Sequence, residues 1–430
     1  MRRIEFQVIL ILLNFLLATL FFPLTQKMLQ TGPRTKVIIG SRESELAMIQ
    51  SRHIQSLLAQ AHPTIEFSIV TSSTLGDEVL DKSLSTLGTN NPGLFTKNLE
   101  AHIVTGRYDL AVHSLKDMPT TLPDGLVLCS ITEREDPTDA LVCHPEYTAA
   151  SPVVNTLADL PPGAVVGTSS LRRQALIGRY YPHLIVKSIR GNLNTRMAKL
   201  DQSTTLQHRT AEGAEQEQGQ GQGEGEGEGE GEGKEDTEKN AKWVGEPGVH
   251  YDAIVLATAG LKRMGWQDRI SNILHAFPYG ISQGALGIET RTNDDWMNQL
   301  IRSTLSDVSS TLRCLAERSF LRSLQGGCQV PIGARSELQT TDEKTLLLTL
   351  EGIVLAEDGS SWSEAKQQIV LTTTLVSEHA LDEEFQTQVE ALGVAVADEA
   401  KKGGAEALLG RGGGEGTVRP ITYSKVATGN

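Results

Sequence analysis

The chain has 430 residues, of which 39% are hydrophobic, and it carries a formal net charge of −14. This length is sufficient for two or three domains that each bury their own core. Residues 201–250 include 13 acidic and 4 basic residues, so the rest of the chain is only mildly acidic. Because non-specific binding to nucleic acid requires a broad basic face, the composition argues against a nucleic-acid partner.

The cysteines form no CxxC pair and no spacing that is typical of metal ligands. They are Cys129, Cys143, Cys314 and Cys328. The sequence therefore predicts no metal site, no disulfide framework and a reducing compartment.

The first residues leave the location open. An apolar run over residues 8–22 follows Arg2 and Arg3. It resembles a signal peptide or a short anchor more than a full membrane span, and a wrongly assigned gene start explains it equally well. We expect a cytoplasmic protein, with targeting to an organelle or anchoring through residues 1–25 as the alternative.

From residue 36 onward, the pattern predicts strands that alternate with helices. Strands are predicted at 37–39, 65–70 and 109–112, and Ser44 can cap a helix between the first two. A second series has strands at 164–166, 184–189 and 251–260 and helices at 171–180 and 195–200. This alternation indicates parallel βαβ units in two α/β regions.

Two stretches depart from that pattern. Residues 219–236 mainly alternate Gly with Glu, so they have nothing apolar to bury, and we expect a disordered acidic insert within 201–248. After residue 307, the pattern predicts a small α+β domain with an antiparallel sheet. It has helices at 309–324 and 377–400 and strands at 346–359 and 368–375, with a turn at Asp358-Gly359.

Three motifs carry most of the functional signal: VHSLKDMP at 112–119, GTSSLRRQ at 167–174 and SIRGNLNTR at 188–196. Each follows a predicted parallel strand, and the carboxyl ends of such strands line the crevice where open α/β sheets bind ligands. The motifs contribute one acid, Asp117, and the cations Lys116, Arg172, Arg173, Arg190 and Arg196. Together they predict a pocket for a small polyanion, with one carboxyl group available for chemistry.

Each motif alone also has an ordinary explanation. The hydroxyls that follow the 164–166 strand can bind an anion at a helix N-terminus, or they can simply cap that helix. Asp117 can move a proton or stabilise a cation, or it can form a structural ion pair. Gly191 can let the backbone approach a ligand, or it can serve an ordinary turn. Two such motifs on successive strand ends favour a ligand with several carboxylates.

Two other short segments have the same ambiguity. Arg42 and Ser44 lie where the first strand meets its helix and form a third segment suited to an anion. Cys328 lies between two glycines and Pro331, which describes either an exposed, stiff loop that presents a thiol or an unremarkable loop cysteine.

Five segments in this order resemble the porphobilinogen deaminase (hydroxymethylbilane synthase) family: HSLKDMP, GTSSLRRQA, IRGNLNTRMAKLD, ATAGLKRMGW and ERSFLRSLQGGCQVPIG. The resemblance covers residues 37–375 apart from the insert. It implies the condensation of four porphobilinogen molecules head-to-tail into the linear tetrapyrrole hydroxymethylbilane, with release of ammonia. It also implies a covalent dipyrromethane cofactor, and we expect a monomer.

The resemblance also implies roles for individual residues. Cys328 would hold the cofactor through a thioether, and Asp117 would be the central catalytic carboxylate. The residues that would contact cofactor or substrate are Arg42, Ser44, Ser114, Lys116, Thr168, Ser169, Ser170, Arg172, Arg173, Arg190, Gly191, Arg196 and Gln283. The chain departs from the family pattern at two places: the loop before GLF has Thr86 and Pro92 where many relatives have lysine, and Ser282 stands where glycine is usual.

The implied fold is two periplasmic-binding-protein-like α/β domains around a cleft and a third α+β domain that bears the cysteine loop. The first domain would cover residues 36–132 and 285–302, the second 138–278 and the third 307–426, after an extension at 1–35. The alternative function is a two-domain solute-binding protein for a small polycarboxylate, which needs neither Asp117 nor Cys328.

Overall fold

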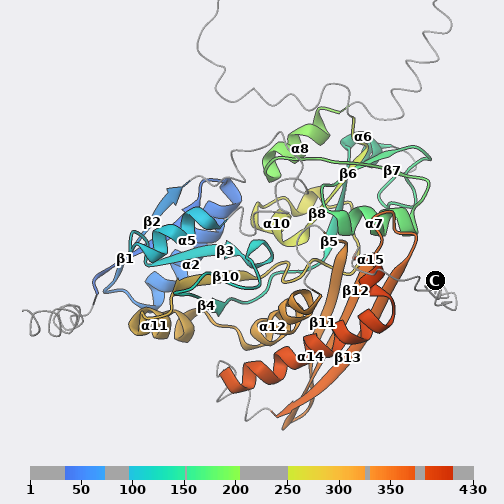
Figure 1. Cartoon of the computed structure of the whole chain (residues 1–430). Coiled ribbons are helices and arrows are strands. Elements are labelled where there is room, and N and C mark those ends of the chain that lie inside the picture. The colour runs from blue at the N-terminus through green and yellow to red at the C-terminus, as the bar shows by residue number, and fades with distance from the viewer. Residues whose placement is uncertain are drawn as a thin grey trace, which may run out of the picture.

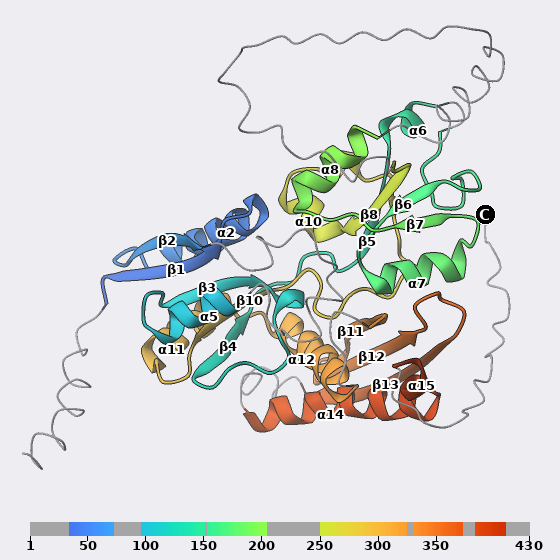
Figure 2. The ribbon, with the colours of Figure 1, turned by 45° about the horizontal axis from the view of Figure 1, so that its top comes forward.

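The computed structural model describes residues 34–72, 96–150, 153–203, 250–324, 330–372 and 383–409. These residues form two five-stranded sheets that each contain parallel strands, and one three-stranded antiparallel sheet. Figures 1 and 2 show the sheets as separate bodies, each with its own helices. At this level the expected class, α/β with an added α+β part, is confirmed.

The first sheet has the strand order β2-β1-β3-β10-β4. β1 (Lys36–Arg42) is parallel to β2 (Glu66–Ser72) and β3 (Leu110–Ser114), whereas β10 (Leu286–Arg291) is antiparallel to β3 and β4 (Leu126–Ile131). Successive side chains of a strand point to opposite faces. Leu110 and Val112 therefore pack with α2 (Glu45–Ala61) and α11 (Asp295–Leu305), while Ala111 packs with α5 (Lys97–Val104).

The second sheet has the order β7-β6-β8-β5-β9. Its strands are β5 (Asp139–Cys143), β6 (Val165–Gly167), β7 (Ile185–Lys187), β8 (Ala253–Ala257) and β9 (Asn272–Ile273). One face packs on α7 (Leu171–Tyr180) and the other on α8 (Leu193–Asp201) and α10 (Thr258–Arg263). The short helices α6 (Pro145–Ala149) and η2 (Gln267–Arg269) complete this part.

Two chain segments, 132–138 and 278–285, connect the first sheet with the second and run beside each other. The backbone N–H of Glu135 donates to the carbonyl of Gly284 at 3.2 Å, and Arg134 Nε donates to the carbonyl of Gln283 at 2.8 Å. Gly284 has φ +93°, and a Cβ there would lie 2.1 Å from the Glu135 carbonyl oxygen. This close approach therefore requires glycine.

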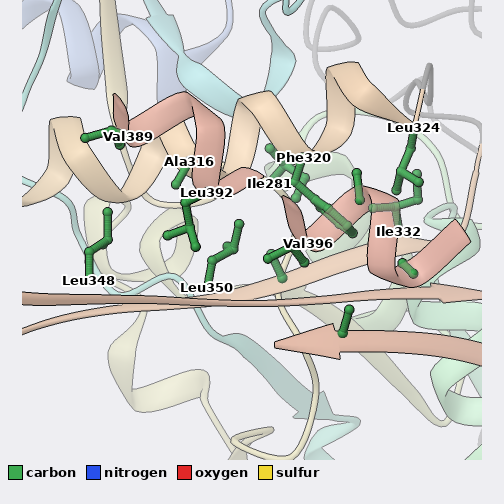
Figure 3. Close-up of a cluster of buried hydrophobic side chains, with 14 of the residues drawn as sticks. Ile281, Ala316, Phe320, Leu324, Ile332, Leu348, Leu350, Val389, Leu392 and Val396 are labelled. Atoms are coloured by element: carbon green, nitrogen blue, oxygen red, sulfur yellow. The ribbon is translucent and has the colours of Figure 1, made fainter. Parts of the chain in front are cut away.

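The third sheet is the meander β11 (Ile332–Asp342), β12 (Thr345–Leu355) and β13 (Trp362–Thr372). Figure 3 shows α12 (Val308–Ser323) and α14 (Glu383–Lys402) packing their apolar side chains against it. The cluster includes Phe320, Leu350 and Val396, which are fully buried. The short helix α15 (Ala405–Leu408) adds Ala405 to it.

α12 also supports both connecting segments. Glu317 and Arg134 form a buried ion pair, with Nη1–Oε1 at 2.6 Å and Nη2–Oε2 at 3.0 Å. The backbone N–H of Ser282 donates to the same carboxylate at 2.7 Å. Burial alone would raise the pKa of Glu317, but Arg134 outweighs burial and holds this pKa below its usual range. The third domain is thus tied to the region between the other two.

The sequence pattern does not indicate several elements of the structure, among them β10 and α11 of the first domain and β11, the first strand of the third sheet. The predicted helix at 171–180 has the same bounds as α7, and α12 is shifted by one residue from the prediction. Most of the insert, nearly all of the extension 1–35 and Cys328 lie outside the described residues. In the part of the chain that is described, no helix is both long and apolar enough to cross a membrane.

Ser282 is one of the positions where the chain departs from the family pattern, and among the described non-glycine residues it alone has a positive φ, +58°. A left-handed conformation costs an L-residue about 1–2 kcal/mol, and glycine avoids this cost. Part of the gain is lost again, because glycine gives the unfolded chain more conformational freedom. We expect Ser282→Gly to raise the free energy of unfolding by about 0.5–1 kcal/mol. Denaturant unfolding would measure this change. Ser282→Ala removes the same buried hydroxyl but keeps the Cβ, so it should gain less than Ser282→Gly. An equal gain in both variants would contradict backbone strain as the cause.

Candidate active site

The three basic motifs lie at strand ends that belong to both α/β domains. The turn η1 (Leu115–Asp117) follows β3 of the first sheet, whereas α7 and α8 follow β6 and β7 of the second. Lys116 on η1 interacts electrostatically with Arg173 on α7 and Arg196 on α8. The structure therefore brings side chains of the three motifs to one place between the domains.

The cations in this place lower one another's pKa. Burial lowers the pKa of Arg196 to about 10, Arg173 and Arg190 act in the same direction, and Asp117 opposes them. The protein around Lys116 lowers its pKa in the same way, although its side chain remains accessible to water. A cluster of mutually repelling cations is stabilised by an added anion. Its donors therefore fit a ligand with several carboxylates.

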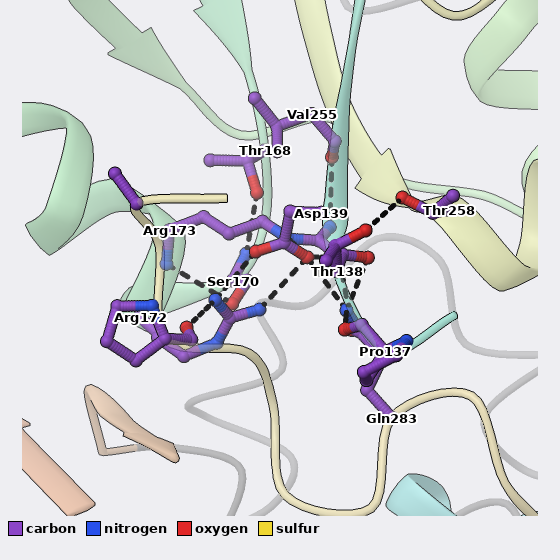
Figure 4. Close-up of polar contacts among 12 residues, drawn as sticks. Pro137, Thr138, Asp139, Thr168, Ser170, Arg172, Arg173, Val255, Thr258 and Gln283 are labelled. Atoms are coloured by element: carbon purple, nitrogen blue, oxygen red, sulfur yellow. Dashed lines mark hydrogen bonds and ion pairs between the residues drawn. The ribbon is translucent and has the colours of Figure 1, made fainter. Parts of the chain in front are cut away.

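Arg172 and Arg173 share one buried carboxylate, that of Asp139 at the start of β5 (Figure 4). Arg172 Nη1 donates to Asp139 Oδ2 at 2.6 Å and to the carbonyl of Pro278 at 2.6 Å. Arg173 donates to Asp139 Oδ1 from Nε at 3.0 Å and from Nη2 at 2.8 Å. Burial would raise the pKa of Asp139, but the two arginines hold it far below its usual value.

Gln283 belongs to the same network and comes from the connecting segment 278–285. Its Nε2 donates to the carbonyl of Pro137 at 2.7 Å and to Asp139 Oδ1 at 2.9 Å. Its Oε1 accepts from Arg173 Nη2 at 3.4 Å. Both polar atoms of Gln283 are thus used by the protein, so it supports Arg173 directly, and a contact with a ligand stays a prediction.

The hydroxyls of GTSSLRRQ mainly fix the local structure. Ser170 is the N-cap of α7 and accepts from the backbone N–H of Arg173 at 3.5 Å, while Thr168 Oγ1 accepts from the backbone N–H of Ser170 at 3.2 Å. Ser169 Oγ donates to the carbonyl of Ile189 at 2.6 Å. These contacts hold the ends of β6 and β7 together and so place the first turn of α7.

The structure explains the glycine at position 191 by the local backbone, a different reason from the expected approach to a ligand. Its φ is +107°, and a Cβ would lie 2.7 Å from the side chain of Thr195. Its carbonyl accepts from Arg196 Nε at 2.8 Å, and the carbonyl of Arg190 accepts from Lys199 Nζ at 3.2 Å. Glycine here allows the turn that brings Arg196 back toward its own strand end, and backbone approach to a ligand stays a prediction.

Arg42 and Ser114 are the last residues of β1 and β3, which are parallel neighbours in the first sheet, and Ser44 follows β1. Ser44 is the N-cap of α2 but makes no capping hydrogen bond with its side chain, whereas Ser114 Oγ accepts from Gln50 Nε2 at 3.0 Å. Next to Ser44, the carboxylate of Glu45 accepts from the side-chain amide of Asn194 on α8. The start of α2 therefore lies beside the start of α8, across the boundary between the α/β domains.

The sequence interpretation missed two residues. Asp139 is the acid that holds both arginines, and its only local signal is a charged residue at the start of an otherwise apolar strand. Arg263 at the end of α10 donates to the carbonyl of Gly284 at 2.7 Å, and burial lowers its pKa. It adds a cation beside the connecting segments. Among the described residues, no group of His, Cys, Asp or Glu side chains could hold a metal ion.

Asp139 also predicts how stability depends on pH. Because its folded pKa lies below the unfolded value of about 3.9, its ion pairs stabilise the fold above that pH and lose this effect as the pH falls below it. We expect Asp139→Asn to lower the free energy of unfolding at neutral pH by about 3 kcal/mol or more.

The difference from the unsubstituted protein should shrink by up to about 1.4 kcal/mol per pH unit below about pH 3.9. Urea unfolding over this range measures it. The matched control is Asp201→Asn, which removes the exposed pair with Arg269 at 2.5 Å and should cost under about 1 kcal/mol. A constant difference at all pH values would contradict the assignment.

Two family models match this chain, and both describe domains of the same family. Residues 37–210 and 239–299 match the family model described as porphobilinogen deaminase, dipyromethane cofactor binding domain, and residues 311–402 match the model of the porphobilinogen deaminase C-terminal domain. Residues 211–238, within the expected insert, fall outside both matches.

Curated relatives agree. The chain is 42% identical to porphobilinogen deaminase of Gloeobacter violaceus, over 87% of this chain and 92% of the relative. It is 39% identical to the enzyme of Synechococcus elongatus, over 88% and 96%. Among solved structures, the BvgS VFT2 domain of Bordetella pertussis matches 68% of this chain and 95% of its own, at 14% identity. Its TM-score of 0.32 is too low to support a conclusion. The family resemblance in the sequence is therefore confirmed, and the chain belongs to the porphobilinogen deaminase family.

Proposed function

We propose that this chain condenses four porphobilinogen molecules head-to-tail into hydroxymethylbilane and releases ammonia at each step. The observation that carries the proposal is the position of Asp117. It interacts electrostatically with Lys116 of its own turn and with Arg196 of the other α/β domain. Asp139 is taken up by two arginines of α7, whereas Asp117 is a partly exposed carboxylate among cations from two domains. This is the arrangement expected for chemistry on a substrate that is itself polyanionic.

The cations would bind the substrate and the growing chain. Each porphobilinogen unit adds two carboxylates, so the negative charge of the bound chain rises as it grows. Lys116, Arg190 and Arg196 can pair with these carboxylates, and the forked donors of arginine suit them. Arg173 is oriented by Asp139 and Gln283, and it is close enough to Lys116 and Arg196 to add to the same positive field.

Arg172 contributes differently. Its Nη1 and Nη2 both donate to Asp139, and Nη1 also donates to the carbonyl of Pro278. Its side chain is only 6% exposed. We therefore assign Arg172 to the support of Arg173 and of the connecting segment 278–285, with any contact to a substrate carboxylate as an addition to that support.

Asp117 would act on the substrate during loss of ammonia. The departure of ammonia leaves an electron-poor pyrrole with positive charge, and an ionised carboxylate beside it lowers the energy of that charge. The same carboxylate can accept or return a proton at the pyrrole nitrogen. Lys116 lies next to Asp117 in the chain and, with Arg196, surrounds the carboxylate with positive charge.

The family implies a dipyrromethane cofactor, and the cation cluster fits its carboxylate side chains. When bound, the cofactor supplies the end to which the first substrate is joined. We assign its attachment to Cys328, on the family motif alone, because this residue lies outside the described residues.

The proposal includes the domain limits expected from the sequence, the periplasmic-binding-protein-like form of the two α/β domains around a cleft, a monomeric state and a cytoplasmic location. A solute-binding protein for a small polycarboxylate is the second candidate, because the cation cluster alone would serve it. It does not require a modified thiol or the formation of a tetrapyrrole, and these two features separate the candidates.

The first test concerns the thiol. We expect the intact protein to carry an added mass equal to one dipyrromethane, and we expect Cys328→Ala to lack both this mass and the release of a linear tetrapyrrole from porphobilinogen. Mass spectrometry and an absorbance assay of the product measure these outcomes. The control is Cys129→Ala, which changes a buried cysteine of the first domain and should keep the added mass of the cofactor. A folded, unmodified protein that releases no tetrapyrrole would favour the solute-binding candidate.

The second test concerns the carboxylate. We expect Asp117→Asn to retain the cofactor mass and to reduce turnover by about 100-fold or more, because the amide can neither exchange a proton nor stabilise a cation. Asp124→Asn, in the loop that precedes β4, provides the same chemical change away from the site and should have normal turnover. Near-normal turnover of Asp117→Asn would remove Asp117 from the mechanism.

A further inference from the structure

Arg318 is a buried arginine that the proposed chemistry does not use. It lies on α12 of the third domain, and its side chain is only 6% exposed. Its guanidinium reaches across the domain boundary to the segment that carries Lys116 and Asp117. In both overall views α12 lies between the first sheet and the third (Figures 1 and 2).

Arg318 donates hydrogen bonds to backbone carbonyls on either side of Lys116 and Asp117. Nη2 donates to the carbonyl of Pro119 at 2.6 Å. Nη1 donates to the carbonyls of Leu115 and Met118 at 3.5 and 3.4 Å. One side chain therefore fixes the start and the end of the turn in which Lys116 and Asp117 lie.

Glu390 attracts the charge of Arg318 only from beyond ion-pair distance. Among the described residues, no carboxylate lies within ion-pair distance of it, and Glu390 pairs instead with Arg322 at 2.6 Å. Burial lowers the pKa of Arg318 to about 10. Burying a cation without a carboxylate is costly unless several acceptors surround it. Within the part of the chain that the structure describes, its acceptors are the carbonyls of Leu115, Met118 and Pro119.

Packing restrains the same turn from the same helix. Leu115 and Met118 are buried in a cluster with Cys314, which lies one helical turn before Arg318 on the same face of α12. The backbone N–H of Leu115 donates to the carbonyl of Ala285 at 3.0 Å. Between them, Lys116 is exposed and Asp117 is partly exposed. The turn thus presents its apolar side chains to α12 and leaves its charged pair on the other side.

We propose that Arg318 is a positioning residue for Asp117: it holds the carbonyls of Leu115, Met118 and Pro119 and so fixes the carboxylate between them relative to the cations of the second domain. This inference rests on the proposed role of Asp117. Displacing a catalytic carboxylate by about 1 Å can slow the reaction on the order of 100-fold while the substrate still binds. Loss of Arg318 should therefore reduce kcat much more than it changes KM.

The experiment uses the full chain and compares Arg318→Met, Arg318→Lys and Arg322→Met, with turnover expressed per cofactor-loaded molecule. We expect Arg318→Met to lower kcat by about 10- to 100-fold with KM for porphobilinogen within about threefold. Arg318→Lys keeps the charge and some of the carbonyl contacts, so it should recover a large part of kcat. Arg322→Met removes an exposed arginine one turn later and should stay within about twofold.

A double variant separates positioning from loss of stability. If Arg318 acts through Asp117, adding Arg318→Met to Asp117→Asn should lower turnover by less than about threefold beyond the single Asp117→Asn variant. A residue that matters only for folding would reduce turnover by the full product of the two single effects. Normal kcat in Arg318→Met, or full multiplication in the double variant, overturns the inference.

Two further outcomes are also decisive. If Arg318→Met does not fold, Arg318→Gln carries the test, because it loses the charge and most of the donors to the three carbonyls. A normal kcat in Arg318→Gln overturns the inference. If Asp117→Asn itself has near-normal turnover, the proposed function of Asp117 fails, and the inference fails with it. The result for Asp117→Asn thus distinguishes failure of the proposed function from failure of the inference alone.

Discussion

The geometry of the site depends on the ion pairs that the Asp139 carboxylate forms with Arg172 and Arg173. Asp139 begins β5, where the chain enters the second α/β domain, and it receives Arg172 and Arg173 from the first turn of α7. Gln283, from the segment that returns to the first domain, donates to the same oxygen as Arg173. Because a buried carboxylate is costly unless each of these donors stays in place, a strand, a helix N-terminus and both connecting segments are held together.

A second support comes from α12, through two consecutive residues. Neighbouring positions on a helix point about 100° apart, so Glu317 and Arg318 can face different partners. Glu317 binds Arg134 and the backbone of Ser282, which belong to the two connecting segments. Arg318 binds the turn at 115–119. The third domain therefore orients the connection between the α/β domains with one residue and the turn of Asp117 with the next.

The elements with regular local patterns could be predicted from the sequence, and those that depend on distant partners could not. α7 has the predicted bounds because a serine N-cap and helical periodicity mark it locally. β11 was missed because the second half of the strand is polar and exposed, and only pairing with β12 supports it. The charged residues of the site were visible as motifs. The partner of Arg172 was not, since Asp139 lies 33 residues earlier in the chain.

The balance of charge connects the fold with the chemistry. Two arginines on one aspartate keep a net positive charge after pairing, and Lys116, Arg190 and Arg196 add to it, with Asp117 as the opposing acid near them. The positive field therefore does not depend on flexible surface side chains, because Asp139 and Gln283 anchor part of it inside the protein. Since the cations come from both α/β domains, a polyanionic ligand that neutralises them must contact both domains.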